Sequence, residues 1–211
     1  MQHESEQAAI IEVGLRLEQK GLVTATEGNL SMRVEGGHLV TASGVNKGAM
    51  KPEHVIFIDG DGRRTSDGPP ITSEAMMHAA IYRLRPDVQA VIHAHPPTAT
   101  AFAVAHIPLD ARILAESVLV LGDVPLIPYA MPGTEELANL VARGLGGGHA
   151  ALLSNHGAIT VGKTLAQAHQ RMETLEHVAR VALMARLLGG PRELSPPEVE
   201  RLLGIKTGPY R

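Results

Sequence analysis

The sequence contains no cysteine and no tryptophan, and its aromatic residues are limited to three tyrosines and two phenylalanines. The absence of cysteine excludes disulfides, iron–sulfur clusters and thiolate zinc sites, and it fits a reducing cytoplasm. So few aromatic rings argue against a base-stacking surface for single-stranded nucleic acid. No hydrophobic run approaches the roughly 20 residues of a membrane span.

An excess of either charge is also absent, because 19 basic residues face 22 acidic ones and the net charge is −3. Without a basic block, duplex nucleic acid is not the expected partner. The opening segment, MQHESEQAAI, is polar and acidic, unlike a signal peptide, so we expect a cytoplasmic protein. Apolar residues make up 44% of the 211 positions. We expect one domain over 1–211, ending in a mobile tail at 204–211.

The order of the predicted elements favours a layered domain, because many strands precede the longest helix. Helices are expected at 4–20, 72–84 and 97–105, from Thr134, at 164–188 and from Ser195. Strands are expected at 30–34, 38–42, 54–58, 87–93, 117–121, 124–127, 150–153 and 158–161. Thr72 and Ser73 are expected to cap the second helix.

Two histidines, His93 and His95, stand at the end of a predicted buried strand. Residues two apart on a strand project to the same face, so both imidazoles can bind one ion. A catalytic zinc site has three protein ligands and one open position. His156 is the candidate third ligand because it follows the apolar strand 150–153 in a turn that contains glycine.

The spacing of His93 and His95 does not by itself exclude that they are ordinary structural histidines. The chain has 11 histidines, so a His-x-His pair arises readily by chance. A cupin-like site needs Glu where Ala99 stands, and a metallo-β-lactamase site needs Asp where Pro96 and Pro97 stand. We interpret the other histidines as structural or surface residues: His3, His38, His54, His78, His106, His149, His169 and His177.

Glu74 is the candidate acid or base. It is placed in the first turn of the helix expected to start near Thr72, where the helix dipole favours a carboxylate. This favourable interaction with the helix dipole would by itself explain a glutamate at position 74, without any catalytic role. The functional alternatives are a general base or a metal ligand displaced by substrate, and the sequence does not separate them.

Three small polar clusters are candidates for an anion site. Glycine lets backbone N–H groups approach an anion, hydroxyl groups donate, and a helix N-terminus adds a positive dipole. Each cluster alone is an ordinary turn or cap. The candidate residues are Gly28 and Asn29, Ser43 and Gly44, and Thr72 and Ser73.

These motifs, in this order, resemble the class II aldolase/adducin family over about residues 5 to 190. The motifs that carry the resemblance are Gly21-Leu22, Thr26-x-Gly28-Asn29-x-Ser31, Thr41-x-Ser43-Gly44, Thr72-Ser73-Glu74, Pro86-Asp87-Val88, His93-x-His95, Pro128-Tyr129-Ala130, Gly133-Thr134 and Asn155-His156-Gly157. Each motif is weak alone, and the ordered set is specific.

The resemblance implies an α/β/α sandwich with a mixed, largely antiparallel central sheet, and a homotetramer with active sites between subunits. It implies one zinc ion per chain on His93, His95 and His156, with Glu74 as the acid and base. Gly28, Asn29, Ser43, Gly44, Thr72 and Ser73 are implied to hold the phosphate of a sugar phosphate. The implied reaction is aldol cleavage of a ketose 1-phosphate.

The sequence departs from the aldolase pattern where an interface tyrosine is expected, some twenty residues past the histidine pair. The stretch 110–117 contains no tyrosine, which leaves the aldehyde half of the substrate open. The family's C-terminal tyrosine corresponds to Tyr210, in a tail rich in glycine and proline.

Three other functions are alternatives to the aldolase. They are a sugar-phosphate dehydratase, a pentulose-phosphate 4-epimerase, which typically has Asp at the position of Glu74, and a non-enzymatic adducin-like module.

Overall fold

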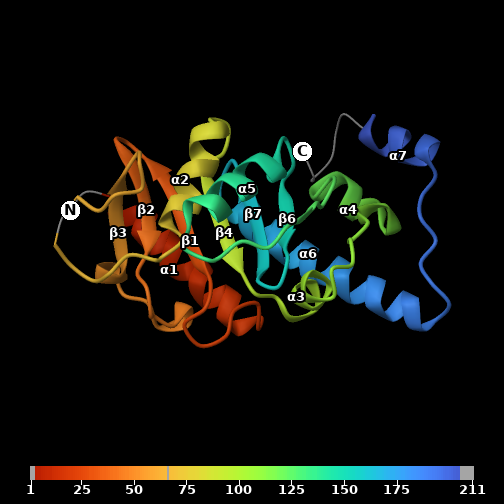
Figure 1. Cartoon of the computed structure of the whole chain (residues 1–211), viewed down its shortest axis with the longest axis horizontal. Helices are drawn as coiled ribbons and strands as arrows, with labels where there is room; N and C mark the ends of the chain where they lie inside the picture. The colour runs from red at the N-terminus through yellow and green to blue at the C-terminus, as the bar shows by residue number, and fades with distance from the viewer. Residues whose placement is uncertain (1–2, 66, 205–211) are drawn as a thin grey trace.

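A computed structural model describes residues 3–65 and 67–204 of the chain, and a mixed sheet forms its centre (Figure 1). The strands are β1 Asn29–Val34, β2 Gly37–Thr41, β3 Val55–Asp59, β4 Ala90–Ala94, β5 Leu126–Ile127, β6 Ala150–Leu153 and β7 Gly157–Gly162. Their order across the sheet is β3-β2-β1-β4-β7-β6-β5. Every neighbouring pair is antiparallel except β5 and β6.

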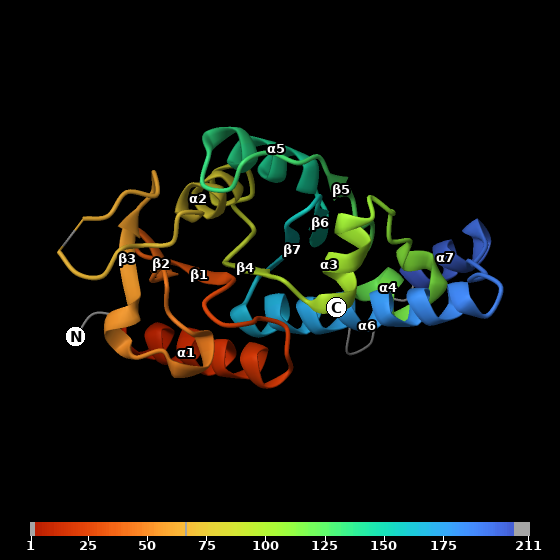
Figure 2. The same cartoon turned by 60° about the horizontal axis from the view of Figure 1, so that its bottom comes forward.

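Helices cover both faces of this sheet (Figure 2). They are α1 Glu4–Gln19, α2 Ala75–Leu84, α3 Pro97–Val104, α4 Ala115–Val120, α5 Glu135–Leu145, α6 Leu165–Leu187 and α7 Pro196–Leu203. Short 3-10 turns are η1 Lys47–Ala49, η2 Pro52–His54 and η3 Ala111–Ile113. One buried cluster joins α1, α3 and α6 to the sheet, and a second joins α2 and α5 to its other face. The predicted α/β/α sandwich with a largely antiparallel sheet is therefore confirmed.

Local sequence signals explain where several helices begin. The hydroxyl of Thr134 accepts a hydrogen bond from the backbone N–H of Leu137 at the start of α5. Thr164 accepts from Gln167 in the same way at the start of α6. Such N-caps satisfy backbone donors that lack a partner within the helix.

The strand predicted at 117–121 is wrong, because this segment lies in α4 and its C-cap. Ser117 donates its hydroxyl hydrogen bond to backbone carbonyls of the preceding turn. Arg171 of α6 donates to the carbonyl of Val120 at the end of α4. An apolar segment this short does not distinguish helix from strand, and here contacts with distant residues decide for a helix.

Within the described residues, no helix combines the length and apolar character needed to cross a membrane.

Candidate metal centre and adjoining pocket

Strand pairing at the centre of the sheet brings the predicted metal ligands together. β4 lies between β1 and β7, and in this register His93 is opposite both Asn29 and Ile159. His95 follows the end of β4. His156 lies in the turn that joins β6 to β7, so that it meets the histidine pair from the neighbouring strands.

Two glycines allow this close approach. A Cβ added to Gly157 would lie 2.5 Å from Cδ2 of His95, and one added to Gly28 would lie 2.8 Å from the backbone oxygen of His93. Gly28 also has a φ of +72°, which side chains other than glycine rarely adopt. Both positions therefore need glycine to keep the neighbouring segments packed around the ligands.

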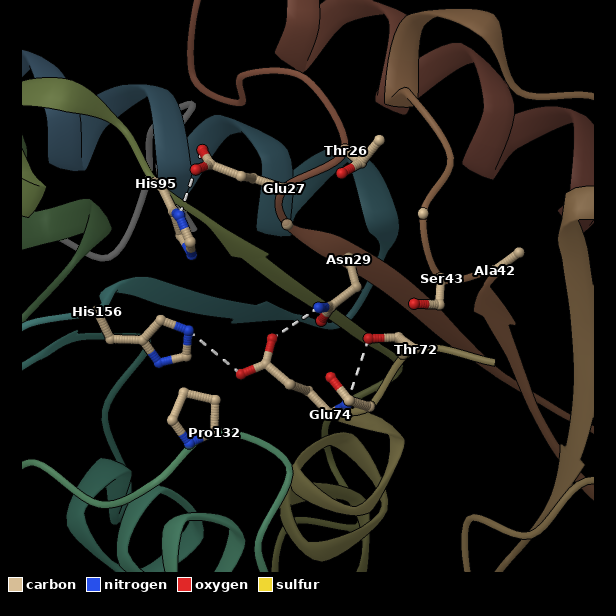
Figure 3. Close-up of a pocket in the computed structure, with 13 residues that line it drawn as sticks. Thr26, Glu27, Asn29, Ala42, Ser43, Thr72, Glu74, His95, Pro132 and His156 are labelled. Carbon is tan, nitrogen blue, oxygen red and sulfur yellow. Dashed lines mark hydrogen bonds and ion pairs between the residues drawn. The ribbon is translucent and has the colours of Figure 1, made fainter. Parts of the chain in front are cut away.

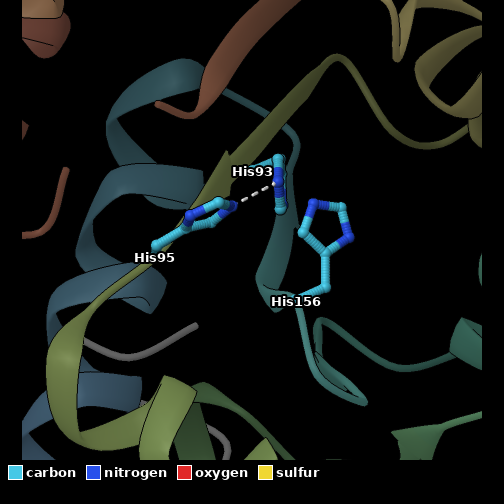
Figure 4. Close-up of side chains that lie close together, drawn as sticks. All are labelled: His93, His95 and His156. Carbon is cyan, nitrogen blue, oxygen red and sulfur yellow. Dashed lines mark hydrogen bonds between the residues drawn. The ribbon is translucent and has the colours of Figure 1, made fainter. Parts of the chain in front are cut away.

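The three histidines form a compact cluster (Figure 4). Each offers one ring nitrogen, and these nitrogens all lie within 4.8 Å of one another. The Nε2 atoms of His93 and His95 are 3.1 Å apart. Burial lowers the pKa of His93 to about 3, which keeps its ring neutral, as a metal ligand must be.

Polar contacts at Nδ1 of two of the rings favour the tautomer that leaves Nε2 free to bind a metal. Nδ1 of His93 lies 3.0 Å from the backbone oxygen of Ala158 and donates to it. Nδ1 of His95 lies 3.4 Å from a carboxylate oxygen of Glu27. An imidazole that donates through Nδ1 presents a lone pair at Nε2, and metal-binding histidines are held in this way. The donor set therefore fits a divalent metal such as zinc.

The carboxylate of Glu74 lies between the histidines and the pocket (Figure 3). Its Oε2 is 3.2 Å from Nε2 of His93 and accepts a 2.8 Å hydrogen bond from the amide of Asn29. Its Oε1 is buried, accepts no hydrogen bond from the described residues, and lies 3.4 Å from Nε2 of His156. A buried oxygen without a donor beside three imidazoles is a further feature that suits a bound cation.

Glu74 itself occupies the N-cap position of α2, which corrects the prediction that Thr72 and Ser73 cap this helix. The Thr72 hydroxyl instead accepts a hydrogen bond from the backbone N–H of Glu74. Because an N-cap residue is only half within the helix, its side chain is free to turn into the pocket.

Opposing influences act on the pKa of Glu74. Burial favours the neutral carboxyl and raises the pKa, while His93, His156 and the hydrogen bond from Asn29 lower it. The net direction is downward, so the carboxylate is ionised at neutral pH. An ionised carboxylate can accept a proton from a substrate.

A cavity of about 200 Å³ adjoins the cluster, and it contains every residue predicted to bind phosphate. Sequence reasoning did not assign Thr26, Glu27, Ala42 or Pro132 to the site, although Thr26 belongs to a motif noted above. The lining residues are Thr26, Glu27, Gly28, Asn29, Ala42, Ser43, Gly44, Thr72, Ser73, Glu74, His95, Pro132 and His156.

His78, interpreted from sequence as structural or surface, is buried directly behind this site. Its Nε2 is 2.5 Å from Oδ1 of Asn29, and its Nδ1 is 2.6 Å from the hydroxyl of Ser31. The Ser31 hydroxyl is in turn 2.8 Å from that of Tyr82. A signal was present in the sequence, since His78 follows Glu74 by one helical turn.

A second buried carboxylate fixes the chain just after His95. Glu176 of α6 accepts hydrogen bonds from the backbone N–H groups of Thr98 and Ala99, both at 2.9 Å, and from the Thr98 hydroxyl at 2.7 Å. These donors lie in the first turn of α3, where intrahelical acceptors are lacking. The longest helix thereby anchors the segment that carries a metal ligand. Tyr210 lies outside the described residues.

Comparisons with known proteins agree with this architecture. A family model for the class II aldolase and adducin N-terminal domain matches residues 8–183. An L-fuculose phosphate aldolase of Haemophilus influenzae is 33% identical over 170 residues, 81% of this chain and 78% of that relative. A 5-methylthioribulose-1-phosphate/5-deoxyribulose-1-phosphate aldolase of Rhodospirillum rubrum is 32% identical over 194 residues, 92% of this chain and 87% of that relative.

Solved structures include an L-fuculose 1-phosphate aldolase with a TM-score of 0.90 and 30% identity, covering 97% of both chains. The family model spans most of the chain, and the relatives align with it over most of their own lengths. This chain belongs to the class II aldolase and adducin N-terminal domain family.

Proposed function

We propose that the chain is a zinc-dependent aldolase that cleaves or forms a ketose 1-phosphate such as L-fuculose 1-phosphate, with dihydroxyacetone phosphate and an aldehyde as the other reactants. The observation that carries this proposal is the position of Glu74, whose carboxylate lies between three histidines and a polar cavity. The related aldolases support it.

His93, His95 and His156 are the residues that would hold the zinc ion. When bound there, a divalent cation supplies a Lewis acid that stabilises negative charge developing on a substrate oxygen. The surrounding side chains would bind the substrate and transfer the protons.

Glu74 is the proposed acid and base. In the direction of synthesis it removes a proton from the hydroxymethyl carbon of dihydroxyacetone phosphate, and the resulting enediolate adds to the aldehyde carbon. In cleavage the same carboxyl returns the proton to that carbon. Tyr210 is the proposed donor of the proton that the aldehyde oxygen needs in synthesis.

The other end of the cavity is the proposed phosphate site. Gly28, Ser43, Gly44, Thr72 and Ser73 line it together with Asn29. One N–H of the Asn29 amide is bonded to Glu74, which leaves its second N–H for an anion. Ser73→Ala should raise KM for the phosphorylated substrate and leave zinc content unchanged. Equal kinetics with phosphorylated and unphosphorylated sugars would disprove a phosphate site.

We also propose a homotetramer in which a neighbouring subunit completes the pocket. Tyr129 and Met131 are 56% and 64% exposed, and Met131 directly precedes Pro132 of the cavity wall. Large apolar side chains beside a binding site are typical of interfaces. Light scattering of the purified protein tests the assembly state.

The deciding experiment measures dihydroxyacetone phosphate released from a panel of ketose 1-phosphates. L-fuculose 1-phosphate is the expected substrate. A second candidate is 5-deoxyribulose 1-phosphate, which appears in the name of the Rhodospirillum relative. The absence of tyrosine at 110–117 leaves the aldehyde half of the substrate open between the two. Loss of water without release of dihydroxyacetone phosphate would contradict both and indicate a dehydratase.

A further inference from the structure

Lys47, at the start of η1, is a lysine with a fully buried side chain. Only 1% of the residue is exposed. Its Nζ donates hydrogen bonds to the backbone oxygen of Val45 at 2.6 Å and to that of Thr26 at 3.1 Å. Lysine is almost never buried so completely without a charged partner, so this ammonium group needs an explanation.

No carboxylate in residues 3–65 or 67–204 lies within ion-pair distance of Lys47. Glu18 of α1 lies against the neighbouring Gly48 and forms no ion pair with Lys47. Burial lowers the pKa of Lys47 to about 8, so the group stays mostly protonated at neutral pH. The fold therefore keeps a buried positive charge whose burial is unfavourable.

The two carbonyl groups that accept hydrogen bonds from Lys47 belong to two loops beside the cavity. Thr26 lies in the loop between α1 and β1, and Val45 lies in the loop between β2 and η1. Thr26 lines the cavity, and Val45 directly follows the lining residues Ser43 and Gly44. The ammonium group thus lies behind the wall at the point where the two loops meet. It connects the loops and places its charge next to the proposed phosphate site.

The charged side chains that line the cavity are unsuited to a phosphate, because two carboxylates there would offset the charge of a divalent cation on the histidines. The described lining includes the carboxylates of Glu27 and Glu74 and neither lysine nor arginine. Hydroxyl groups, glycine N–H groups and a helix N-terminus are donors, but they carry no full charge to balance a dianion. In the protein interior, a unit charge acts over several ångströms much more strongly than in water.

We propose that the buried ammonium of Lys47 supplies the positive side-chain charge that the cavity lining lacks, and that it stabilises a phosphate dianion between the two loops that it holds together. The inference rests on the proposed phosphate site, and it does not depend on aldol chemistry. It assigns Lys47 to anion binding and gives it no part in proton transfer.

The test measures the affinity of the zinc-loaded protein for inorganic phosphate by calorimetry, with no reaction involved. Lys47→Met keeps most of the side-chain volume and removes the charge and the donors. Lys47→Gln also removes the charge but keeps two N–H donors for the carbonyl groups. Lys51→Met removes an exposed lysine four residues further on and is the matched control.

We expect both Lys47 variants to bind phosphate at least about tenfold more weakly than the native chain, and Lys51→Met to bind it equally. If Lys47→Gln keeps native affinity, the charge is not used and the proposal is overturned. Failure of the native protein to bind phosphate would overturn it as well.

Zinc content and circular dichroism identify a variant that does not fold, and in that case the other Lys47 variant decides. Weaker phosphate binding in a protein that releases no dihydroxyacetone phosphate would support the role of Lys47 and contradict the aldolase proposal. Failure of the Lys47 proposal and failure of the aldolase proposal therefore give different results.

Discussion

His78 fixes the direction of the Asn29 amide. Its Nε2 lies 2.5 Å from Oδ1 of Asn29, so the nitrogen side of that amide faces Glu74, to which it donates at 2.8 Å. On the other side of the ring, Nδ1 accepts from Ser31. The neutral tautomer of His78 with its proton on Nε2 satisfies every hydrogen bond in this chain from Ser31 to Glu74.

We predict that His78→Leu lowers kcat by about 10- to 100-fold, because the Asn29 amide, which donates to Glu74, loses the contact that orients it. His78→Gln keeps a donor toward Asn29 and should recover most of the lost kcat. Zinc content should match the native protein in both variants. Equal activity of the two variants would show that the hydrogen bond to Asn29 does not matter.

Glu74→Gln separates binding from proton transfer. The amide keeps the shape of the side chain and removes the base, so affinities for zinc and phosphate should persist. Exchange of the carbon-bound proton of dihydroxyacetone phosphate with solvent deuterium should fall by at least about 100-fold. Exchange near the native rate in a zinc-loaded variant would assign the base to another residue.

Removal of one ligand tests the metal centre. His95→Ala should weaken zinc binding by at least about 100-fold, since loss of even an outer-shell partner costs 10- to 100-fold. The rise in Tm that zinc gives the native protein should disappear with it. His177→Ala removes an exposed histidine and is the control. One tightly held zinc per His95→Ala chain would contradict the ligand assignment.

Acid should destabilise the fold through His78. Burial lowers the pKa of His78 to about 4 from 6.5, so between these values the unfolded chain binds a proton that the folded chain does not. The contribution is complete above pH 6.5 and is lost as the pH falls toward 4. At pH 5 the loss is about 2 kcal/mol.

Urea unfolding at pH 7 and pH 5 measures this loss. The free energy of unfolding should fall by about 2 kcal/mol less in His78→Gln than in the native chain. Identical losses in the two proteins would mean that His78 is protonated in the folded state.

The role of Tyr210 can be tested by deleting residues 207–211. If the tyrosine protonates the aldehyde oxygen, kcat for aldol cleavage or synthesis should fall by about 100-fold. Deuterium exchange into dihydroxyacetone phosphate, which involves no aldehyde, should persist. An unchanged kcat would remove Tyr210 from the mechanism.

The parts of the site that could be predicted from sequence are those with a local pattern. His93 and His95 are two apart on one strand, and Gly28, Ser43 and Ser73 belong to short motifs that line one cavity. The positions of Lys47 and His78 could not be predicted in this way. Lys47 lies in an ordinary polar loop, and only the packing of distant segments makes it buried.

The same limit explains the error at 117–121. Val118 and Leu121 are buried, and their spacing suits a helix, but the short apolar segment reads equally well as a strand. Its partner, Arg171, lies far along the chain in α6. The sheet was predictable because most of its strands alternate or form bounded apolar runs, with turn residues between them.

The link between Glu176 and the start of α3 has a consequence for how the protein acquires its metal. His93 and its backbone partner Ala158 are 65 residues apart, and Glu176 is 78 residues from Thr98. Zinc fingers gather their ligands from short local spacings, so metal drives their folding. Here the histidines come from β4, the residue after it and the turn before β7, which are far apart in the chain. We therefore expect a metal ion to enter a chain that has already folded, and we expect the chain to stay folded when a chelator withdraws the ion.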